Sequence, residues 1–224
     1  MDHIEFSSEF DILYNNIMSN AAPGLNEYEK SVFLTQAQEQ TVIEAYTGDN
    51  NNSSFERTEE VRRYLSELVK TYITDTKESG TGLSDNSVFF KIPDDIWYVT
   101  YESVKLLDDN LGCKNGSEAL VFPTTQDEYW RLSKNPFRGP SDSRVLRLDN
   151  NSNLIELISK YNINTYLIRY LVQPSPIILD DLSSYDMTIN GVSEITECKL
   201  NPVLHRVILT RAVTLAKLAY IGKE

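Results

Sequence analysis

The stretch NPVLHRVILTRAVTLAKLAYIG, residues 201–222, predicts one long helix with a wide apolar face. Asn201 can cap its start, Pro202 suits the first helical position, and Gly222 can end it. At about 100° per residue, the apolar side chains cover half of the helix circumference. A face of that width must be buried on more than one side, so the helix needs partners in the chain or in another subunit.

Helical periodicity also marks the first part of the chain. Residues 7–20, 26–46 and 58–72 each carry apolar side chains at helical spacing. Asn26 and Glu29 have the spacing of a capping box at the start of the second helix. We expect these helices to pack with the C-terminal helix.

The middle of the chain is rich in aromatic and β-branched residues that alternate with polar ones, as strands prefer. The expected strands are residues 87–92, 96–106, 144–149, 153–159 and 163–172. Asn190 followed by Gly191 predicts a two-residue hairpin turn. A short helix, capped by Thr125 and ended by Pro136, interrupts the strands.

Together these patterns predict an α+β fold: an N-terminal helical bundle, a central, mainly antiparallel β-sheet with a short inserted helix, and a long C-terminal helix. Four ranges follow along the chain. They are an N-terminal helical region at 1–74, a polar linker at 75–86, a β-rich region at 87–198, and a C-terminal helix at 199–224 that packs on the helical region.

The charge is acidic and unevenly distributed. The net charge is −12, and such a chain repels phosphate, which argues against tight nucleic-acid binding but allows DNA to slide past. Residues 1–60 carry a net charge of −10 and residues 199–224 carry +4. These opposite charges suit head-to-tail association of subunits, although both ends could equally be solvated helix faces.

Targeting signals are not evident in the sequence. No run of about 18 apolar residues predicts a membrane span. The N-terminal segment is acidic and lacks the basic flank of a signal peptide. We expect a protein that is cytoplasmic when made, with no membrane partner.

A catalytic, cofactor or metal site is not predicted. His3 and His205 are far apart in sequence, and Cys113 and Cys198 lack the paired spacing of a zinc site. Adjacent carboxylates occur, but neighbours in a strand or turn point apart and do not face one site. The glycine-rich phosphate motifs are missing as well. We therefore expect no enzyme activity and no cofactor.

The C-terminal helix is the first candidate contact surface. Arg206 and Arg211 lie on its polar stripe, and Ile208 and Leu215 lie on its apolar face. We expect these four residues, with the acidic N-terminal helices, to form the contact between subunits.

The loop KNPFRGPSDSR, residues 134–144, is the second candidate. It places Phe137, Arg138 and Arg144 in a proline-rich stretch of an otherwise acidic chain. A phenylalanine anchor with arginine contacts is typical of docking loops, and we expect this loop to dock on a partner. A stiff surface loop is the alternative interpretation.

Five stretches resemble a structural protein of the crAss-like phages, the tailed phages of gut Bacteroidetes. They are FLTQAQEQTVIEAY (33–46), PTTQDEYWRLSKNPFRGP (123–140), RVLRLD (144–149), YLIRYL (166–171) and ECKLNPVLHRVILTRAVTLA (197–216). The resemblance spans about residues 26–220 in the same order, apart from the loops at 48–55 and 75–86.

This resemblance implies a bacteriophage virion protein of the neck, one of the head-to-tail connector rings associated with the portal. It implies a ring of about twelve copies that extends the portal DNA channel and joins head to tail. The implied partners are the portal, other neck or tail ring proteins, and packaged DNA that passes without sequence-specific binding. The resemblance does not decide between two positions, the first ring below the portal and a lower ring of the tail.

Two other functions fit the sequence less well. One is a phage binding module outside the virion, such as an assembly chaperone or a regulator of a host protein, which would be missing from purified particles. The other is a hydrolase built from scattered Asp and Glu residues, which would need two carboxyls in one concave pocket.

Overall fold

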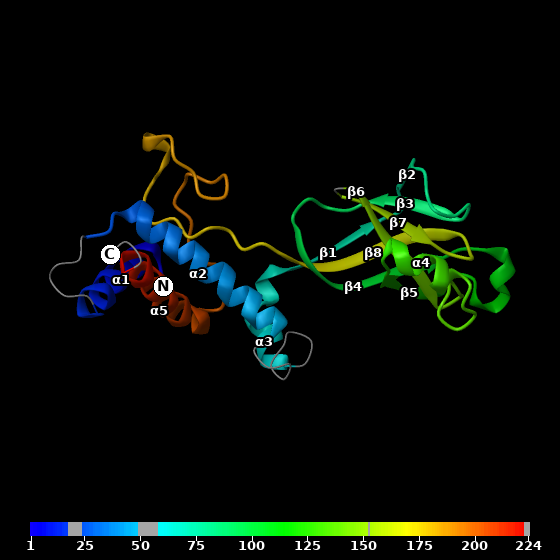
Figure 1. The fold of residues 1–224 in the computed structure, drawn as a ribbon, viewed down its shortest axis with the longest axis horizontal. Helices are drawn as coiled ribbons and strands as arrows, with labels where there is room; N and C mark the ends of the chain where they lie inside the picture. The colour runs from blue at the N-terminus through cyan, green and yellow to red at the C-terminus, as the bar shows by residue number, and fades with distance from the viewer. Residues whose placement is uncertain (18–23, 49–57, 152, 222–224) are drawn as a thin grey trace. The chain divides into compact units, whose positions relative to one another are not determined.

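In the computed structural model of the chain, the described residues are 1–17, 24–48, 58–151 and 153–221. The chain forms two compact units. The helical unit combines Met1–Leu68 with Gln173–Glu224, and the sheet unit is Val69–Val172. Figure 1 shows the helices of the first unit and the curled strands of the second.

The helical unit is built from α1 (His3–Ile17), α2 (Glu27–Thr47), α3 (Glu59–Tyr64) and α5 (Pro202–Ile221). The long helix α5 packs against α2 and α1 (Figure 1). This arrangement confirms the predicted packing of the C-terminal helix on the N-terminal helices. The predicted ends of the first and last helices, at residues 20 and 222, lie outside the described residues.

Apolar side chains at helical spacing form the core of this unit. Those of α1 and α2 are Phe6, Phe10, Tyr14, Leu34, Ala37 and Val42. Those of α5 are Leu204, Ile208, Leu209, Ala212, Val213 and Ala216. Because α5 buries this face against two helices at once, the wide apolar stripe in its sequence is explained within one chain.

A charge cluster around the buried Lys30 joins α1 to α2. The ammonium of Lys30 lies 2.7 Å from Asp11 Oδ2, 2.9 Å from Glu27 Oε1 and 3.2 Å from Ser7 Oγ. Burial opposes the charge of Lys30, but the hydrogen bonds to the two carboxylates outweigh it and raise the pKa. All three N–H groups of the Lys30 ammonium therefore have acceptors, and these bonds fix the position of α1 along α2.

The sheet unit contains eight strands. They are β1 (Val69–Thr74), β2 (Lys77–Glu78), β3 (Ser87–Lys91), β4 (Ile96–Leu106), β5 (Glu118–Pro123), β6 (Arg144–Asn151), β7 (Leu154–Ile158) and β8 (Ile163–Val172). Their order across the sheet is β1-β8-β4-β5-β6-β7-β3-β2. All neighbouring strands are antiparallel except the parallel pair β5 and β6, which α4 (Gln126–Ser133) connects. The prediction of a mainly antiparallel sheet with a short inserted helix is confirmed.

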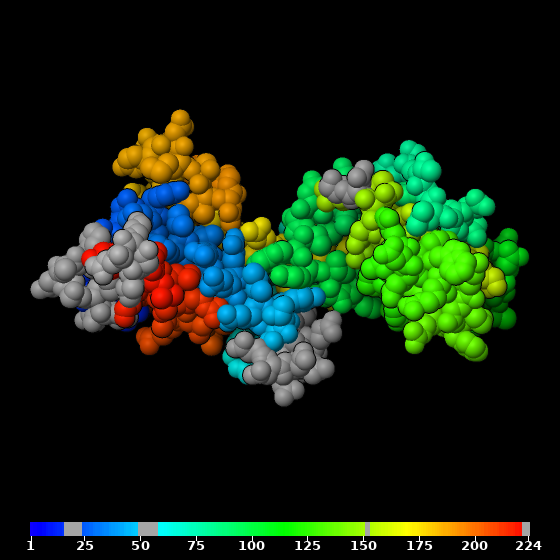
Figure 2. Space-filling model, in the orientation of Figure 1, coloured from blue at the N-terminus to red at the C-terminus, as the bar shows by residue number. Residues whose placement is uncertain are grey.

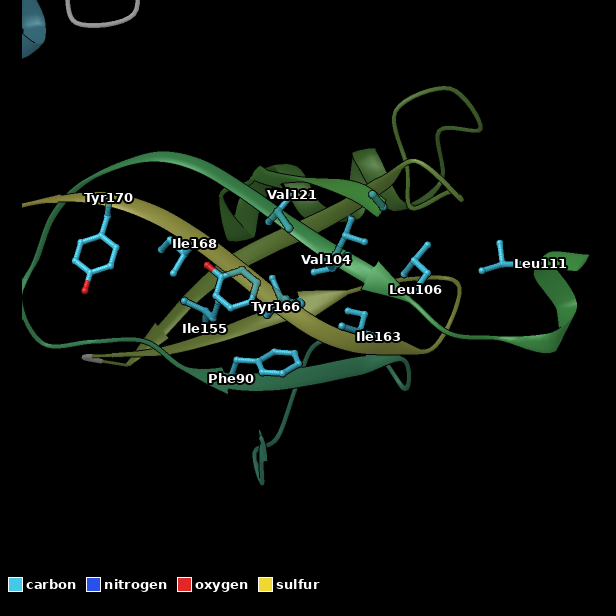
Figure 3. Packing of buried hydrophobic residues seen from close by; sticks show 13 residues of the cluster. Phe90, Val104, Leu106, Leu111, Val121, Ile155, Ile163, Tyr166, Ile168 and Tyr170 are labelled. Carbon is cyan, nitrogen blue, oxygen red and sulfur yellow. The ribbon is translucent and has the colours of Figure 1, made fainter. Parts of the chain in front are cut away.

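The sheet curls around its own hydrophobic core. Figure 3 shows side chains from several strands pointing toward one another inside the curl. The largest include Phe90 of β3, Leu106 of β4, Ile155 of β7 and Tyr166 of β8. Since successive side chains of a strand alternate between faces, every second residue of these strands contributes to this core.

One predicted helix is wrong over its second half. The helical pattern of residues 58–72 continues only to Tyr64, where α3 ends, and β1 begins at Val69. The sequence VKTYIT favours a strand by its β-branched and aromatic residues, and it pairs along its whole length with β8. Tertiary pairing therefore decides the conformation of a segment whose apolar spacing also fits a helix.

The segment that follows β8 returns to the helical unit. Ile177, Ile178 and Leu179 are buried, and Leu179 N–H donates to Ser31 Oγ of α2. Beyond them the chain forms the predicted hairpin turn, in which Asn190 (φ 51°) and Gly191 (φ 80°) both have positive φ. The boundaries of the two units therefore differ from the predicted ranges. Residues 69–74 belong to the sheet unit, and residues 173–198 belong to the helical unit.

Candidate functional site

The solvent-facing stripe of α5 carries the predicted arginines. Arg206 is exposed and has no carboxylate partner among the described residues. It lines a shallow groove on the α5 surface together with Val207, Thr210 and the half-buried Leu215. This stripe offers a cation and apolar side chains to a partner.

Arg211 is engaged within the chain. Its guanidinium forms an ion pair with Glu44 of α2 and donates from Nη1 to Thr41 Oγ1 at 3.3 Å. One positive charge of the C-terminal segment and one negative charge of the N-terminal segment therefore pair within the helical unit, and neither is left for contact between subunits. Of the two arginines, Arg206 is the one left available for another subunit.

Ile208 lies in the core of the helical unit with no exposed surface. Its side chain packs between the helices, so it holds α5 in place and does not itself reach another subunit. The apolar residues of α5 that remain exposed are Val203, Val207 and Leu218. At about 100° per residue, these three residues lie on the same side of the helix as Thr210 and Thr214, away from the buried face.

The loop at 134–144 is held rigidly on the sheet unit. Tyr129 and Leu132 of α4 pack on Leu146, Leu148 and Ile158, which anchors the start of the loop. Within the loop, Asn135 Oδ1 accepts hydrogen bonds from the backbone N–H groups of Phe137 (2.9 Å) and Arg138 (3.2 Å). These bonds fix a tight turn that presents both side chains to solvent.

Aromatic rings and cations alternate around this loop. Phe137 is 91% exposed and Trp130 is 66% exposed. The ammonium of Lys134 lies 3.8 Å above the Trp130 ring, and the guanidinium of Arg144 lies 4.3 Å from the Phe122 ring centre. The predicted residues Phe137, Arg138 and Arg144 therefore share one surface with aromatic residues that the sequence did not single out.

A buried polar network lies inside the sheet. The Glu102 carboxylate accepts a 2.6 Å hydrogen bond from Arg147 Nη1 and another from the Tyr166 hydroxyl. Burial, together with this carboxylate, raises the pKa of Tyr166 far above its ordinary value, so the phenol stays protonated. Sequence spacing could have revealed Glu102, since it alternates with Val104 and Leu106 on the inner face of β4.

The adjacent carboxylates of the sequence have local structural roles where the chain is described. Asp95 pairs with Lys70 at 2.7 Å, and this contact lowers the pKa of its carboxyl. Asp108 accepts from the backbone N–H of Asn110 and caps a short turn. Within the described ranges, no three or more His, Cys, Asp or Glu side chains are grouped to hold a metal ion. None of the described helices has the length and apolarity needed to cross a membrane.

His205 is buried and has hydrogen-bond partners on both ring nitrogens. Nε2 lies 2.9 Å from the Leu200 carbonyl, and Nδ1 lies 3.0 Å from the α-amino group of Met1. The Phe6 ring packs at 5.4 Å between centroids. Burial lowers the pKa of this imidazole below 6.5, although the Leu200 carbonyl partly opposes the shift.

This environment predicts a pH dependence of stability. Because the folded state holds His205 neutral, the unfolded chain binds more protons below about pH 6.5, and stability is lost as the pH falls from there toward the folded pKa. His205→Gln, which keeps a donor for Leu200, should lose less stability than the wild type between pH 7.5 and 5.5. Urea unfolding at both pH values checks this, and equal losses in the two proteins would rule His205 out as the cause.

Comparisons with known proteins match this chain over nearly its whole length. The profile of the phage tail ring protein 3/4 family covers residues 1–223. Ring protein 3 of Bacteroides phage crAss001 is 57% identical over 219 residues, which cover 96% of this chain and 95% of that protein. Ring protein 4/5 of the same phage is 42% identical over 229 residues, covering 97% of this chain and 93% of that protein. The chain therefore belongs to the phage tail ring protein 3/4 family, the structural ring proteins of crAss-like phages.

Proposed function

We propose that the protein forms a closed ring in the neck of the virion, where it extends the portal DNA channel and joins head to tail. The observation that carries the proposal is membership of the tail ring protein family over residues 1–223. A closed ring needs two different surfaces on each subunit, and the stripe of α5 and the acidic N-terminal helices are two such surfaces. We infer about twelve copies, with the portal and other ring proteins as neighbours.

The acidic charge supports a passive role toward DNA. With a net charge of −12, the chain repels phosphate at distances below the Debye length of about 8 Å. Nineteen acidic and nine basic residues lie in the helical unit, whereas the sheet unit is nearly balanced with fourteen and twelve. A channel wall of this composition lets packaged DNA move without sequence-specific binding.

Within the ring, α5 contacts the acidic N-terminal helices of the neighbouring subunit through Arg206 and Leu215, whereas Arg211 is held by Glu44 of its own chain. Ile208 positions the helix from inside. Loop residues Phe137, Arg138 and Arg144 contact a neighbouring ring. Presence of the chain in purified virions is the first test, and its absence from particles would favour a binding module that acts outside the virion.

Charge reversal at Arg206 should weaken assembly without unfolding the protein. Its side chain is exposed, so Arg206→Glu should change the stability by no more than about 0.5 kcal/mol. Facing the acidic helices of a neighbour, the new carboxylate should reduce incorporation into particles about tenfold. The measurement is the amount of the chain in purified particles, with the exposed Lys199→Glu as control. Normal incorporation of Arg206→Glu would show that α5 does not form the contact.

A further inference from the structure

The loop surface of the sheet unit is larger than the loop itself. We define the aromatic–basic surface as Phe122, Trp130, Lys134, Phe137, Arg138 and Arg144. Figure 2 shows the segment around α4 at the surface of the sheet unit. Exposed aromatic and arginine side chains of this kind are enriched in protein interfaces and supply most of their binding energy.

Three of its cations are not neutralised by carboxylates within the described residues. Arg131 nearby pairs with Glu128, and Asp142 pairs with Lys114. Lys134 contacts the Trp130 ring, and Arg144 contacts the Phe122 ring and the Arg138 carbonyl. The surface therefore offers uncompensated positive charge next to exposed rings, which favours an acidic partner that also carries apolar side chains.

The helical unit carries a segment of that chemistry. Residues 180–197, here called the arm, contain five acidic residues and no basic one. The arm exposes Tyr185 (64%), Ile195 and Met187 to solvent. Figures 1 and 2 show it standing out beside α2.

The arm is an ordered element that packs on α2 through a small hydrophobic cluster. Ile178, Leu182 and Ile189 are buried against Tyr28 and Val32 of α2. The Leu182 N–H donates to the Ser193 carbonyl at 2.9 Å, and Ile178 pairs with Thr196 in an antiparallel bridge. Because the arm is already folded, binding through it costs little ordering entropy.

The acids of the arm are freer than those of the N-terminal helices. On the helices, Asp11 and Glu27 are held by Lys30, and Glu44 is held by Arg211. In the arm, Asp180 and Glu194 have no cation partner within the described part of the chain, and Asp181 stays ionised because Ser183 lowers its pKa. The arm is thus an acidic surface with charge to offer another molecule.

We propose that the aromatic–basic surface of one copy binds the arm of a second copy of this chain. The contact is heterologous, since it joins two different surfaces, and repeated contacts of this type form a ring when the rotation between copies closes. Lys134, Arg138 and Arg144 face the carboxylates of the arm, while Phe137 and Trp130 pack against Tyr185 and Met187. This inference rests on the proposed ring function, and it assigns the loop to a neighbouring copy within the same ring in place of a neighbouring ring.

Cysteine cross-linking of the full chain tests the contact. On a Cys113→Ser background, Phe137→Cys and Tyr185→Cys proteins are mixed and treated with a short bismaleimide, which also traps transient encounters. A covalent dimer of the two variants is expected, and it can only form between copies. The matched control pairs Tyr185→Cys with Lys91→Cys, an exposed position on β3 outside the surface. Dimer no more abundant than in this control overturns the proposal.

Charge exchange tests the chemistry of the same contact. Lys134→Glu with Arg138→Glu, or Asp180→Lys with Glu194→Lys, should each reduce the trapped dimer about tenfold. A dimer formed between a surface-reversed copy and an arm-reversed copy should recover the wild-type yield. If exchange fails to restore it, charge complementarity is not the basis of the contact and the proposal is overturned.

A structure of the neck in intact virions distinguishes failure of this inference from failure of the proposed function. A closed ring in which Phe137 touches residues 180–197 of another copy supports both. If the ring is present but the two surfaces lie apart, the inference fails and the ring function stands. If the chain is missing from the neck, the proposed function itself fails.

Discussion

Replacing Glu102 with alanine is expected to lower the free energy of unfolding of the sheet unit by about 3–5 kcal/mol. The substitution leaves the largely buried guanidinium of Arg147 with only the exposed Asp149, 3.2 Å from its Nε. It also leaves the buried Tyr166 hydroxyl without its acceptor. An unpaired charge buried in a core destabilises the folded state by more than the intact ion pair stabilises it. The loss of unfolding free energy in Glu102→Ala therefore exceeds that for removing an ordinary hydrogen bond.

Tryptophan fluorescence can isolate this effect, since Trp97 and Trp130 both lie in the sheet unit. Urea unfolding followed by fluorescence should show the shift, and Glu118→Ala at an exposed position of β5 should not. Replacing Glu102 and Arg147 together by methionine should restore part of the loss, because no charge is then left buried. A loss below about 1 kcal/mol in Glu102→Ala would mean that water reaches Arg147.

Ile208→Ala should strongly destabilise the helical unit, with a loss of about 2–5 kcal/mol in the free energy of unfolding. The side chain is fully buried where α5 meets the other helices, so the substitution leaves a cavity that rigid helices fill only in part. The exposed neighbour Val207→Ala is the control and should change stability little. Assembly of Ile208→Ala should fail together with folding, unlike that of Arg206→Glu.

Far-UV circular dichroism reports this change, because the three long helices belong to the helical unit. In urea, the dichroism transition of Ile208→Ala should move to lower concentration while the fluorescence transition of the sheet unit stays in place. A normal dichroism transition with lost assembly would contradict the position of Ile208 inside the unit and would make it a contact residue after all.

Strong local patterns in the sequence were sufficient for most of the fold. The long helix at the C-terminus, the capping box at Asn26 and the Asn190–Gly191 turn follow from side-chain spacing and turn chemistry alone. The strands at 96–106 and 163–172 agree with β4 and β8 to the residue. These signals are local, so neighbouring residues suffice to specify them.

Features that depend on distant residues were missed. The segment 69–74 has helical apolar spacing, and only its pairing with β8 makes it a strand. The strand β5 was not expected, because EALVFP is short and its parallel pairing with β6 requires a crossover through α4. Likewise, the return of residues 173–198 to the helical unit depends on buried contacts with α2, more than a hundred residues away.

The candidate contact surfaces could be predicted only in outline. Sequence periodicity placed Arg206 and Arg211 on one stripe, but the ion pair with Glu44 that removes Arg211 is a tertiary contact. The loop at 134–144 was recognisable by its prolines and its unusual charge. Its extension to Trp130 and Phe122 follows from the cation–ring contacts, which link side chains from three separate segments.

Cryo-electron microscopy of intact virions is the measurement that tests the central claim most directly. We expect density for this chain as a closed ring at the head-to-tail junction, around the DNA channel, with α5 at the contact between adjacent subunits. If virions lack such a ring although the cells that made them express the chain, a structural role in the neck is contradicted.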